Sequence, residues 1–253
     1  MRATVLCTWR EWDSQFFGYR IAQVAPHRLD APQLREVERW CAGERIDCLY
    51  FLADSDAPDT IRLVERARFQ CVDIRVHLTS DSSASRPAVD SSVRPLAPDD
   101  VPEVRAIARR TLRHSRFYFD DHFSAEQREG LYDLWARQSC EGQADVVLVS
   151  GHRDRVVGFV TGHVGEDGAG SIGLLAVDGS ARGAGVGGAL VGDVLGWFAG
   201  RGISRVSVVA QGRNPAAVRV YERCGFRLDS LHLWYHRWFS DDHDAEVISV
   251  DTP

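Results

Sequence analysis

The sequence predicts an α/β protein of two parts: a smaller N-terminal α/β domain, and a larger α+β domain with helices flanking a mixed, largely antiparallel central sheet. Strand-like and helix-like segments alternate along the 253 residues. A stretch almost without apolar side chains, 81–92, separates two such sets and is predicted to be a linker. In the second set, consecutive strand segments precede a glycine-rich turn, which indicates an antiparallel meander.

The N-terminal domain is expected at 1–80. Asp30 before Ala31-Pro32 predicts the start of a helix that runs to about 42 and ends at Gly43. Asp56 predicts a second helix to about 67. The aromatic segment 12–18 is expected to be a loop. Candidate strands lie at 3–9, 19–24, 48–52 and 69–78. The order ββαβαβ predicts a sheet with helical crossovers.

The second domain is expected at 93–240, followed by an acidic tail at 241–253. A helix begins after Asp99-Asp100, and an aromatic, charged loop without clear periodicity follows at 114–123. Further helices are expected at 125–140, 186–198 and 214–223. Candidate strands lie at 93–96, 146–150, 156–164, 172–177, 206–210 and 226–238.

Composition excludes several classes of protein. The net charge of −6 argues against a nucleic-acid partner, because such proteins are usually basic on at least one face. No apolar stretch has the length of a membrane span or a signal peptide, so the sequence predicts a cytoplasmic protein. The six cysteines form no C-x-x-C pair and match no metal-binding spacing, so no metal is expected.

The glycine-rich turn Arg182-Gly-Ala-Gly-Val-Gly187 lies between an apolar strand and an apolar helix. Glycines let the backbone present its N–H groups, and the helix dipole adds positive potential, so the turn is a candidate phosphate or pyrophosphate site. A dinucleotide-binding unit would carry this turn after an early strand, and a P-loop requires a lysine. Here the turn comes late, and the chain contains no lysine.

Two motifs together resemble the GCN5-related N-acetyltransferase (GNAT) family. The turn matches that family's Arg/Gln-x-x-Gly-x-Gly/Ala motif. Asn214, followed seven residues later by Tyr221 and then by Gly225-Phe226, matches its second signature. This resemblance covers about 93–238. Shorter motifs, including Trp12-Asp-Ser-Gln-Phe-Phe-Gly18 and Leu233-Trp-Tyr-His-Arg237, are similar to the dTDP-fucosamine acetyltransferases within that family.

The resemblance implies an acyltransferase that uses acetyl-CoA. It implies that the pantetheine arm pairs with the edge of the strand before the turn, at Leu175, Ala176 and Val177, and that an N–H of this strand stabilises the oxyanion. The remaining cofactor contacts would be Arg182, Gly183, Ala184, Gly185, Val186, Gly187, Gly188 and Asn214. Asn214 is equally well placed to be a helix N-cap.

Tyr221 is the implied general acid for the departing thiolate, although its helical spacing with Val218 also suits a core residue. The general base stays open among His163, Glu166, His232 and a water chain. The loop residues Arg116, Phe117 and Tyr118 are the candidate acceptor contacts, since an arginine can pair with a diphosphate and an aromatic ring can stack on a base.

The subfamily resemblance implies acetylation of the amine of a dTDP-4-amino-4,6-dideoxy sugar. Two alternatives remain: a family member acetylating an aminoglycoside, a polyamine or a protein N-terminus, and a non-catalytic CoA-binding or interaction module. The final segment, Leu231 to Phe239, alternates apolar and aromatic side chains on both faces. Such a strand needs cover on both sides, which a partner copy in a homodimer would supply.

Overall fold

The computed structural model describes residues 6–82, 92–152 and 155–239. These residues divide into two compact units. Unit 1 comprises 6–74, 119–123 and 231–239, and unit 2 comprises 75–82, 92–118, 124–152 and 155–230. Most of the predicted linker and the predicted acidic tail lie outside the described residues. Across the described part of the chain, no helix combines the length and apolar character needed to cross a membrane.

Unit 1 contains four neighbouring strands. β1 (Cys7–Trp9) is antiparallel to β2 (Ile21–Val24), and β2 is parallel to β3 (Cys48–Asp54). The C-terminal half of β10 (Arg227–Trp238) pairs antiparallel with β3, from His232 opposite Asp54 to Trp238 opposite Cys48. The helices are α1 (Glu11–Phe17), α2 (Ala31–Glu44) and α3 (Pro58–Arg66). The segment 12–18, expected to be a loop, is therefore mostly helical.

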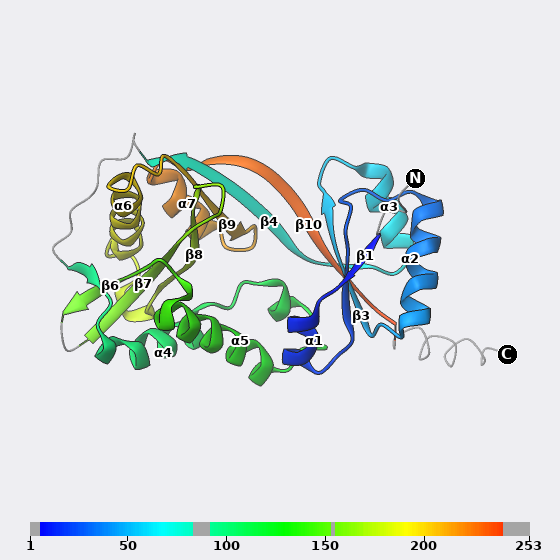
Figure 1. Ribbon diagram of the computed structural model, residues 1–253, viewed down its shortest axis with the longest axis horizontal. Coiled ribbons are helices and arrows are strands. Elements are labelled where there is room, and N and C mark those ends of the chain that lie inside the picture. The colour runs from blue at the N-terminus through cyan, green and yellow to red at the C-terminus, as the bar shows by residue number, and fades with distance from the viewer. Residues whose placement is uncertain (1–5, 83–91, 153–154, 240–253) are drawn as a thin grey trace. The chain divides into compact units, whose positions relative to one another are not determined.

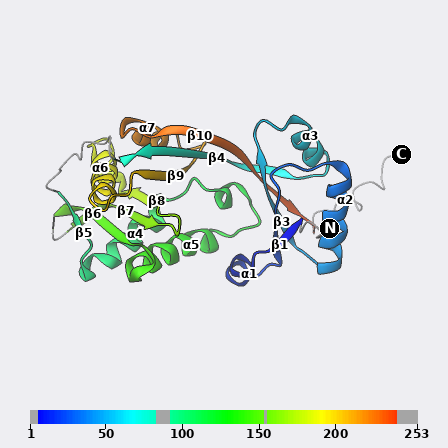
Figure 2. The same cartoon turned by 45° about the horizontal axis from the view of Figure 1, so that its top comes forward.

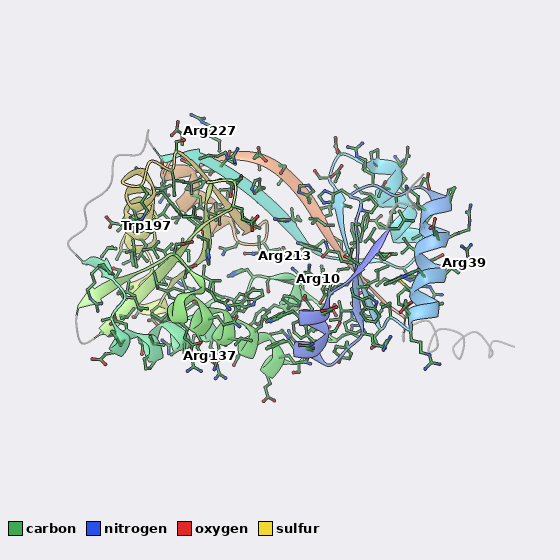
Figure 3. The ribbon with its side chains drawn as sticks, viewed as in Figure 1. Arg10, Arg39, Arg137, Trp197, Arg213 and Arg227 are labelled. Carbon is green, nitrogen blue, oxygen red and sulfur yellow. The ribbon has the colours of Figure 1, made fainter. Side chains whose placement is uncertain are left out.

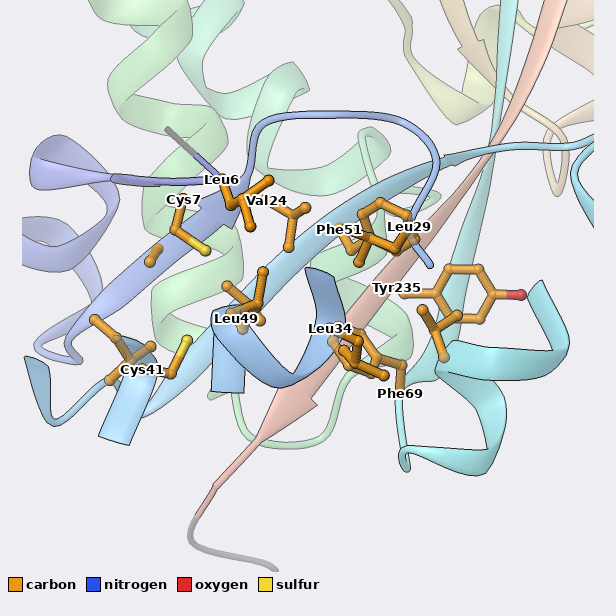
Figure 4. Close-up of a cluster of buried hydrophobic side chains, with 14 of the residues drawn as sticks. Leu6, Cys7, Val24, Leu29, Leu34, Cys41, Leu49, Phe51, Phe69 and Tyr235 are labelled. Carbon is orange, nitrogen blue, oxygen red and sulfur yellow. The ribbon is translucent and has the colours of Figure 1, made fainter. Parts of the chain in front are cut away.

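The predicted start of α2 is confirmed, because Asp30 accepts a hydrogen bond from the Gln33 amide at 2.8 Å and Gln33 reciprocates. Side chains of α2 and α3 pack on one face of the strands, around Leu49, Phe51 and Tyr235 (Figure 4). Cys7 and Cys41 lie in this core as free thiols.

The other face of these strands is covered by residues of the same unit. Phe17 contacts Phe123 at 4.5 Å between ring centroids, and the rings of Tyr50 and His236 stack at 4.4 Å. Phe123 also packs edge-on to Trp238. Side chains of this chain thus cover both faces of β10. The alternation of apolar and aromatic residues in β10 therefore does not by itself indicate a partner copy.

Unit 2 carries six neighbouring strands in the order β4-β9-β8-β7-β6-β5. They are β4 (Gln70–Asp81, in this unit from Arg75), β9 (Arg205–Gln211), β8 (Gly170–Val177), β7 (Arg155–Val164), β6 (Val146–His152) and β5 (Val93–Pro95). Only the β8–β9 pair is parallel. The predicted mixed, largely antiparallel sheet is confirmed.

Helices cover both faces of the unit 2 sheet (Figures 1 and 2). On one face, α6 (Val186–Ala199) and α7 (Pro215–Arg223) pack against Val160, Ile172 and Val208. On the other, α4 (Val101–Thr111) and α5 (Ala125–Gln138) pack against Val149 and Phe159. Trp197 of α6 and Arg137 of α5 mark these two sides in Figure 3.

The two units are not the two continuous segments that composition indicates. β4 begins in unit 1 and ends in unit 2, and β10 begins in unit 2 and ends in unit 1. Composition reveals the polar segment after β4. It does not reveal that a long strand is shared by both units, because the apolar alternation is the same along the whole strand.

Candidate active site

The parallel strands β8 and β9 separate part-way along their length. They pair only at Gly170–Val206, Ser171–Ser207 and Ile172–Val208. β8 continues for five more residues to Val177, still paired with β7, and β9 continues to Gln211, still paired with β4. Among the described residues, the side of β8 that faces β9 therefore has no strand partner beyond Ile172.

The backbone groups on this side of β8 can be assigned from the ladder with β7. Asp178 donates its N–H to the Val157 carbonyl at 2.8 Å, and the Ala176 carbonyl lies close to Gly158. Because alternate residues of a strand direct their N–H and C=O groups to opposite neighbours, Leu175 and Val177 direct theirs toward the gap. This edge can accept an extended, amide-containing molecule as an added strand.

The glycine-rich turn follows β8 and leads into α6. Gly183 and Gly185 have φ of 80° and 84°, in the left-handed region that glycine adopts without strain. Residues 182–185 are exposed. The first N–H groups of α6, at Val186, Gly187 and Gly188, have no acceptor within the helix. Together with the helix dipole they form the anion site that the sequence predicts.

The start of the turn is fixed by charged and polar side chains. Asp178 accepts hydrogen bonds from the Ser180 amide and hydroxyl, and Arg110 of α4 donates to its other oxygen at 3.0 Å. The Ser180 hydroxyl and amide, with Arg110, lower the pKa of Asp178 to about 2, so this carboxylate stays ionised at neutral pH. The turn is therefore anchored at 178–181, while its glycines remain accessible.

α7 brings the second predicted motif to the same place. The Asn214 side-chain oxygen accepts from the Ala217 amide at 3.1 Å, so Asn214 is the N-cap. Its side-chain NH₂ is not used by the cap and can still donate. A Cβ on Gly187 would lie 3.7 Å from Val220 of α7 and 3.8 Å from Val177 of β8, so the three elements meet here.

Tyr221 is buried in the core between α7 and the sheet, with 5% of its surface exposed. Its ring lies edge-on to Phe226 at 5.5 Å. Burial, with a smaller effect of Cys224, raises the pKa of Tyr221 well above its usual value, so the hydroxyl keeps its proton. None of the described residues hydrogen-bonds to this hydroxyl, which leaves it free to donate to a bound molecule.

Sequence reasoning missed a β-bulge at the point where β8 leaves β9. Gly173 and Leu174 together oppose Thr161 of β7. The Thr161 hydroxyl oxygen accepts from the Leu174 amide at 2.9 Å and lies 3.3 Å from Nε2 of His163, whose Nδ1 lies 3.2 Å from the Gln143 carbonyl. A single glycine within an apolar strand was the available signal.

The sequence of this region matches a family model. Residues 110–226 match the model described as "Acetyltransferase (GNAT) family". The chain carries a GNAT acetyltransferase domain. Unit 2 holds the matched residues, apart from 119–123, and the strand gap, glycine-rich turn and α7 described above lie within the match.

A curated relative is the spore coat polysaccharide biosynthesis protein SpsD of Bacillus subtilis (strain 168), 27% identical over 144 residues. The match covers 57% of this chain and 50% of SpsD, so the chain spans about half the length of this relative.

Solved structures share the fold. A GCN5-related N-acetyltransferase from Sphaerobacter thermophilus has a TM-score of 0.62 at 16% identity, over 86% of this chain and 72% of its own. A glucosamine N-acetyltransferase region of a fungal multi-domain β-N-acetylglucosaminidase has a TM-score of 0.60 at 12% identity, over 87% of this chain and 30% of its own. The matched 86% and 87% of this chain are more than the residues of unit 2 make up, so the likeness includes residues of unit 1.

The three residues predicted as candidate bases have different surroundings. Both ring nitrogens of His163 lie within hydrogen-bonding distance of the protein, as described above. Glu166 is exposed in the turn between β7 and β8. His232 belongs to unit 1, where its Nε2 lies 3.6 Å from Asp54. None of the three therefore combines a free ring nitrogen or carboxylate with a place on the β8–β9 gap.

The three residues of the predicted acceptor loop also have different surroundings. Phe117 has 1% of its surface exposed, so its ring is part of the core and not a free stacking surface. The Arg116 guanidinium lies over that ring at 4.3 Å. The Tyr118 hydroxyl is buried without a hydrogen-bond partner among the described residues, and burial raises its pKa. The guanidinium of Arg128 lies over the Tyr118 ring at 5.6 Å.

The GNAT domain also contains a cavity of about 940 Å³ at the C-terminal end of α7. Its lining includes Gly188, Arg205 and Arg223, but not Asn214 or Tyr221. Of the predicted cofactor residues, only Gly188 lines this cavity.

Proposed function

We propose that this chain transfers the acetyl group of acetyl-CoA to the amine of a nucleotide-linked amino sugar, of the dTDP-4-amino-4,6-dideoxyhexose type. The observation that carries the proposal is the unpaired edge of β8, which ends at the open N-terminus of α6. An extended chain with two amides, ending in a pyrophosphate, is complementary to that combination.

In this proposal the amides and carbonyls of Leu175 and Val177 bind the pantetheine arm. The N–H groups of Val186, Gly187 and Gly188, with Arg182, bind the pyrophosphate. The Asn214 side-chain NH₂ supplies a further donor. The N–H of Leu175 lies toward the start of the gap and is the oxyanion donor we propose, because the Leu174 N–H is already bonded to Thr161.

The reaction then requires the attacking amine to lose a proton and the departing sulfur to gain one. The neutral amine attacks the thioester carbonyl, a C–N bond forms, and the ammonium proton leaves to water. The C–S bond breaks, and Tyr221 donates its proton to the departing sulfur. Solvent returns a proton to the phenolate. A sugar amine is only weakly basic, so a water chain suffices as the proton acceptor and none of His163, Glu166 or His232 is required.

Two observations support an amino-sugar acceptor. SpsD is described as a polysaccharide biosynthesis protein. The loop before α5 also carries a buried, unpartnered Tyr118 hydroxyl, a group that gains from a hydrogen bond to a polar ligand. Arg116 is the diphosphate contact we propose. Phe117, whose ring is buried, would support the loop.

The experiment is a thiol-release assay with acetyl-CoA and a panel of amines, comparing the wild type with Tyr221→Phe. We expect release with dTDP-amino sugars and none with aminoglycosides, polyamines or peptides. Tyr221→Phe should lower kcat about 100-fold or more and leave the Kd of acetyl-CoA within twofold, because only the proton donor is lost.

The other outcomes are equally informative. Release with aminoglycosides or polyamines alone would contradict the sugar acceptor and leave acetyl transfer intact. Acetyl-CoA binding without release on any amine would contradict catalysis and favour a binding module. An equal kcat for Tyr221→Phe would contradict the acid role. Light scattering tests the homodimer, which stays a prediction.

A further inference from the structure

Two histidines and an aspartate meet at one edge of unit 1, outside the acetyltransferase domain. Nδ1 of His27 lies 3.2 Å from Oδ1 of Asp54, and Nε2 of His232 lies 3.6 Å from the same oxygen. The two imidazole rings are 4.9 Å apart and nearly perpendicular. All three candidate ligand atoms lie within 4.8 Å of one another.

The topology of unit 1 brings these residues together. β2 and β3 are parallel, so His27, three residues after β2, and Asp54, the last residue of β3, lie at the same end of the sheet. β10 is antiparallel to β3, and His232 is the direct cross-strand partner of Asp54. The residues are distant in sequence, which is why spacing rules do not find them.

The backbone holds this edge in place. The Asp54 amide donates to the His27 carbonyl at 3.1 Å, and the Ser55 amide donates to the Leu231 carbonyl at 3.4 Å. The buried Thr60 hydroxyl bonds to both the amide and the carbonyl of Leu29, which ties the segment after His27 to α3. The three side chains are therefore positioned by independent contacts and not only by each other.

The orientation of the Asp54 carboxylate is also set. Arg28 donates to Oδ2 at 2.7 Å and to Asp56 at 2.7 Å. This bond occupies one oxygen of Asp54 and leaves Oδ1 facing the two imidazoles. Partners that orient a ligand in this way are typical of metal sites.

We propose that His27, Asp54 and His232 form a binding site for one Zn²⁺ ion. Zn–N and Zn–O bonds of about 2.1 Å in a tetrahedron place the ligand atoms about 3.4 Å apart. The two nitrogen–oxygen separations, 3.2 Å from His27 and 3.6 Å from His232 to Oδ1 of Asp54, lie on either side of that value. The 3.6 Å separation is too long for a hydrogen bond but suits an intervening ion. Two imidazoles favour Zn²⁺ over Mg²⁺ or Ca²⁺.

The fourth coordination position would be taken by water. The His27 side chain is 45% exposed and that of Asp54 is 26% exposed, so the site is open on one side. The ion would join the β2–α2 segment, the end of β3 and the paired part of β10. It would therefore cross-link these three segments at this edge of unit 1 and stabilise their arrangement.

The test is titration of the metal-free full chain with ZnCl₂ by calorimetry, for the wild type, His27→Ala and Asp54→Asn. His77→Ala is the matched control, because His77 pairs with Asp229 at 2.9 Å in unit 2 as an imidazole–carboxylate pair. We expect one site in the wild type and in His77→Ala, with Kd within twofold. His27→Ala and Asp54→Asn should raise that Kd at least tenfold, since each removes a ligand.

Two further measurements keep the result decisive if other histidines or cysteines also take up zinc. Co²⁺ should give the visible spectrum of a four-coordinate site in the wild type and lose it in His27→Ala. Zn²⁺, but not Mg²⁺, should raise the unfolding temperature of the wild type and not of His27→Ala. Equal Zn²⁺ affinity, stoichiometry and Co²⁺ spectra in wild type and His27→Ala would overturn the proposal.

Discussion

At Gly173, one added methyl group should have a large effect on the acetyltransferase domain. A Cβ at this position would lie 2.5 Å from Nε2 of His163 and 2.8 Å from the hydroxyl oxygen of Thr161. Neither neighbour can move freely: His163 is held at the Gln143 carbonyl, and the buried Thr161 accepts from the Leu174 amide. Gly173→Ala must therefore break the bulge or displace His163.

The magnitude follows from these contacts. Leaving the Leu174 amide unpaired costs about 1–3 kcal/mol, and the overpacking adds about 1–3 kcal/mol. We expect Gly173→Ala to lower the free energy of unfolding by about 2–6 kcal/mol. Because the bulge sets the position of the Leu175 and Val177 amides, a shift near 1 Å should also lower kcat/KM about 100-fold.

Urea unfolding and steady-state thiol release measure the two effects. Gly43→Ala is the control, because Gly43 lies in α2 with no atom within 4 Å of its added Cβ; it should stabilise by up to about 1 kcal/mol. Adding His163→Ala to Gly173→Ala removes the closer contact and should restore part of the stability. Unchanged unfolding and unchanged kcat/KM in Gly173→Ala would refute the reasoning.

Three other predictions concern separate parts of the molecule. Asn214→Asp keeps the helix cap but removes the NH₂ donor, so calorimetry should show weaker acetyl-CoA binding with an unchanged unfolding temperature; equal affinity would remove Asn214 from the cofactor site. Gly185→Ala forces alanine to a φ of 84°, which should cost about 1–2 kcal/mol and weaken CoA binding, as urea unfolding and titration would measure. Asp120 is buried, which tends to raise its pKa, but hydrogen bonds from His236, Trp238 and His122 hold that pKa well below its usual range. Its stabilising effect should be full above about pH 4 and be lost as the pH falls further; Asp120→Asn should lower the unfolding free energy by about 3 kcal/mol at pH 7 and flatten this acid dependence in urea titrations.

Local signals predicted features of both units. The capping residues Asp30 and Asn214 behave as their sequence contexts indicate, because a cap is an interaction over three residues. The glycines at 183 and 185 have the positive φ values that the turn requires. These features depend only on neighbours in sequence, so the sequence contains all the information that determines them.

The features that were missed depend on residues distant in sequence. The bulge at Gly173 is defined by Thr161 on another strand, and the burial of Phe117 depends on how the loop packs. The grouping of His27 with Asp54 and His232 needs the strand order of unit 1. Periodicity reports which side of a strand is apolar, but not which strand lies beside it.

The path of β10 has a consequence for the synthesis of the protein. Residues from Leu231 onward supply the strand that pairs with β3, yet they are made after all of unit 2. The unit that contains the N-terminus therefore cannot complete its sheet until the ribosome has added Trp238. A fragment ending at residue 80 would expose one edge of β3, and folding of this unit must wait for nearly the whole chain.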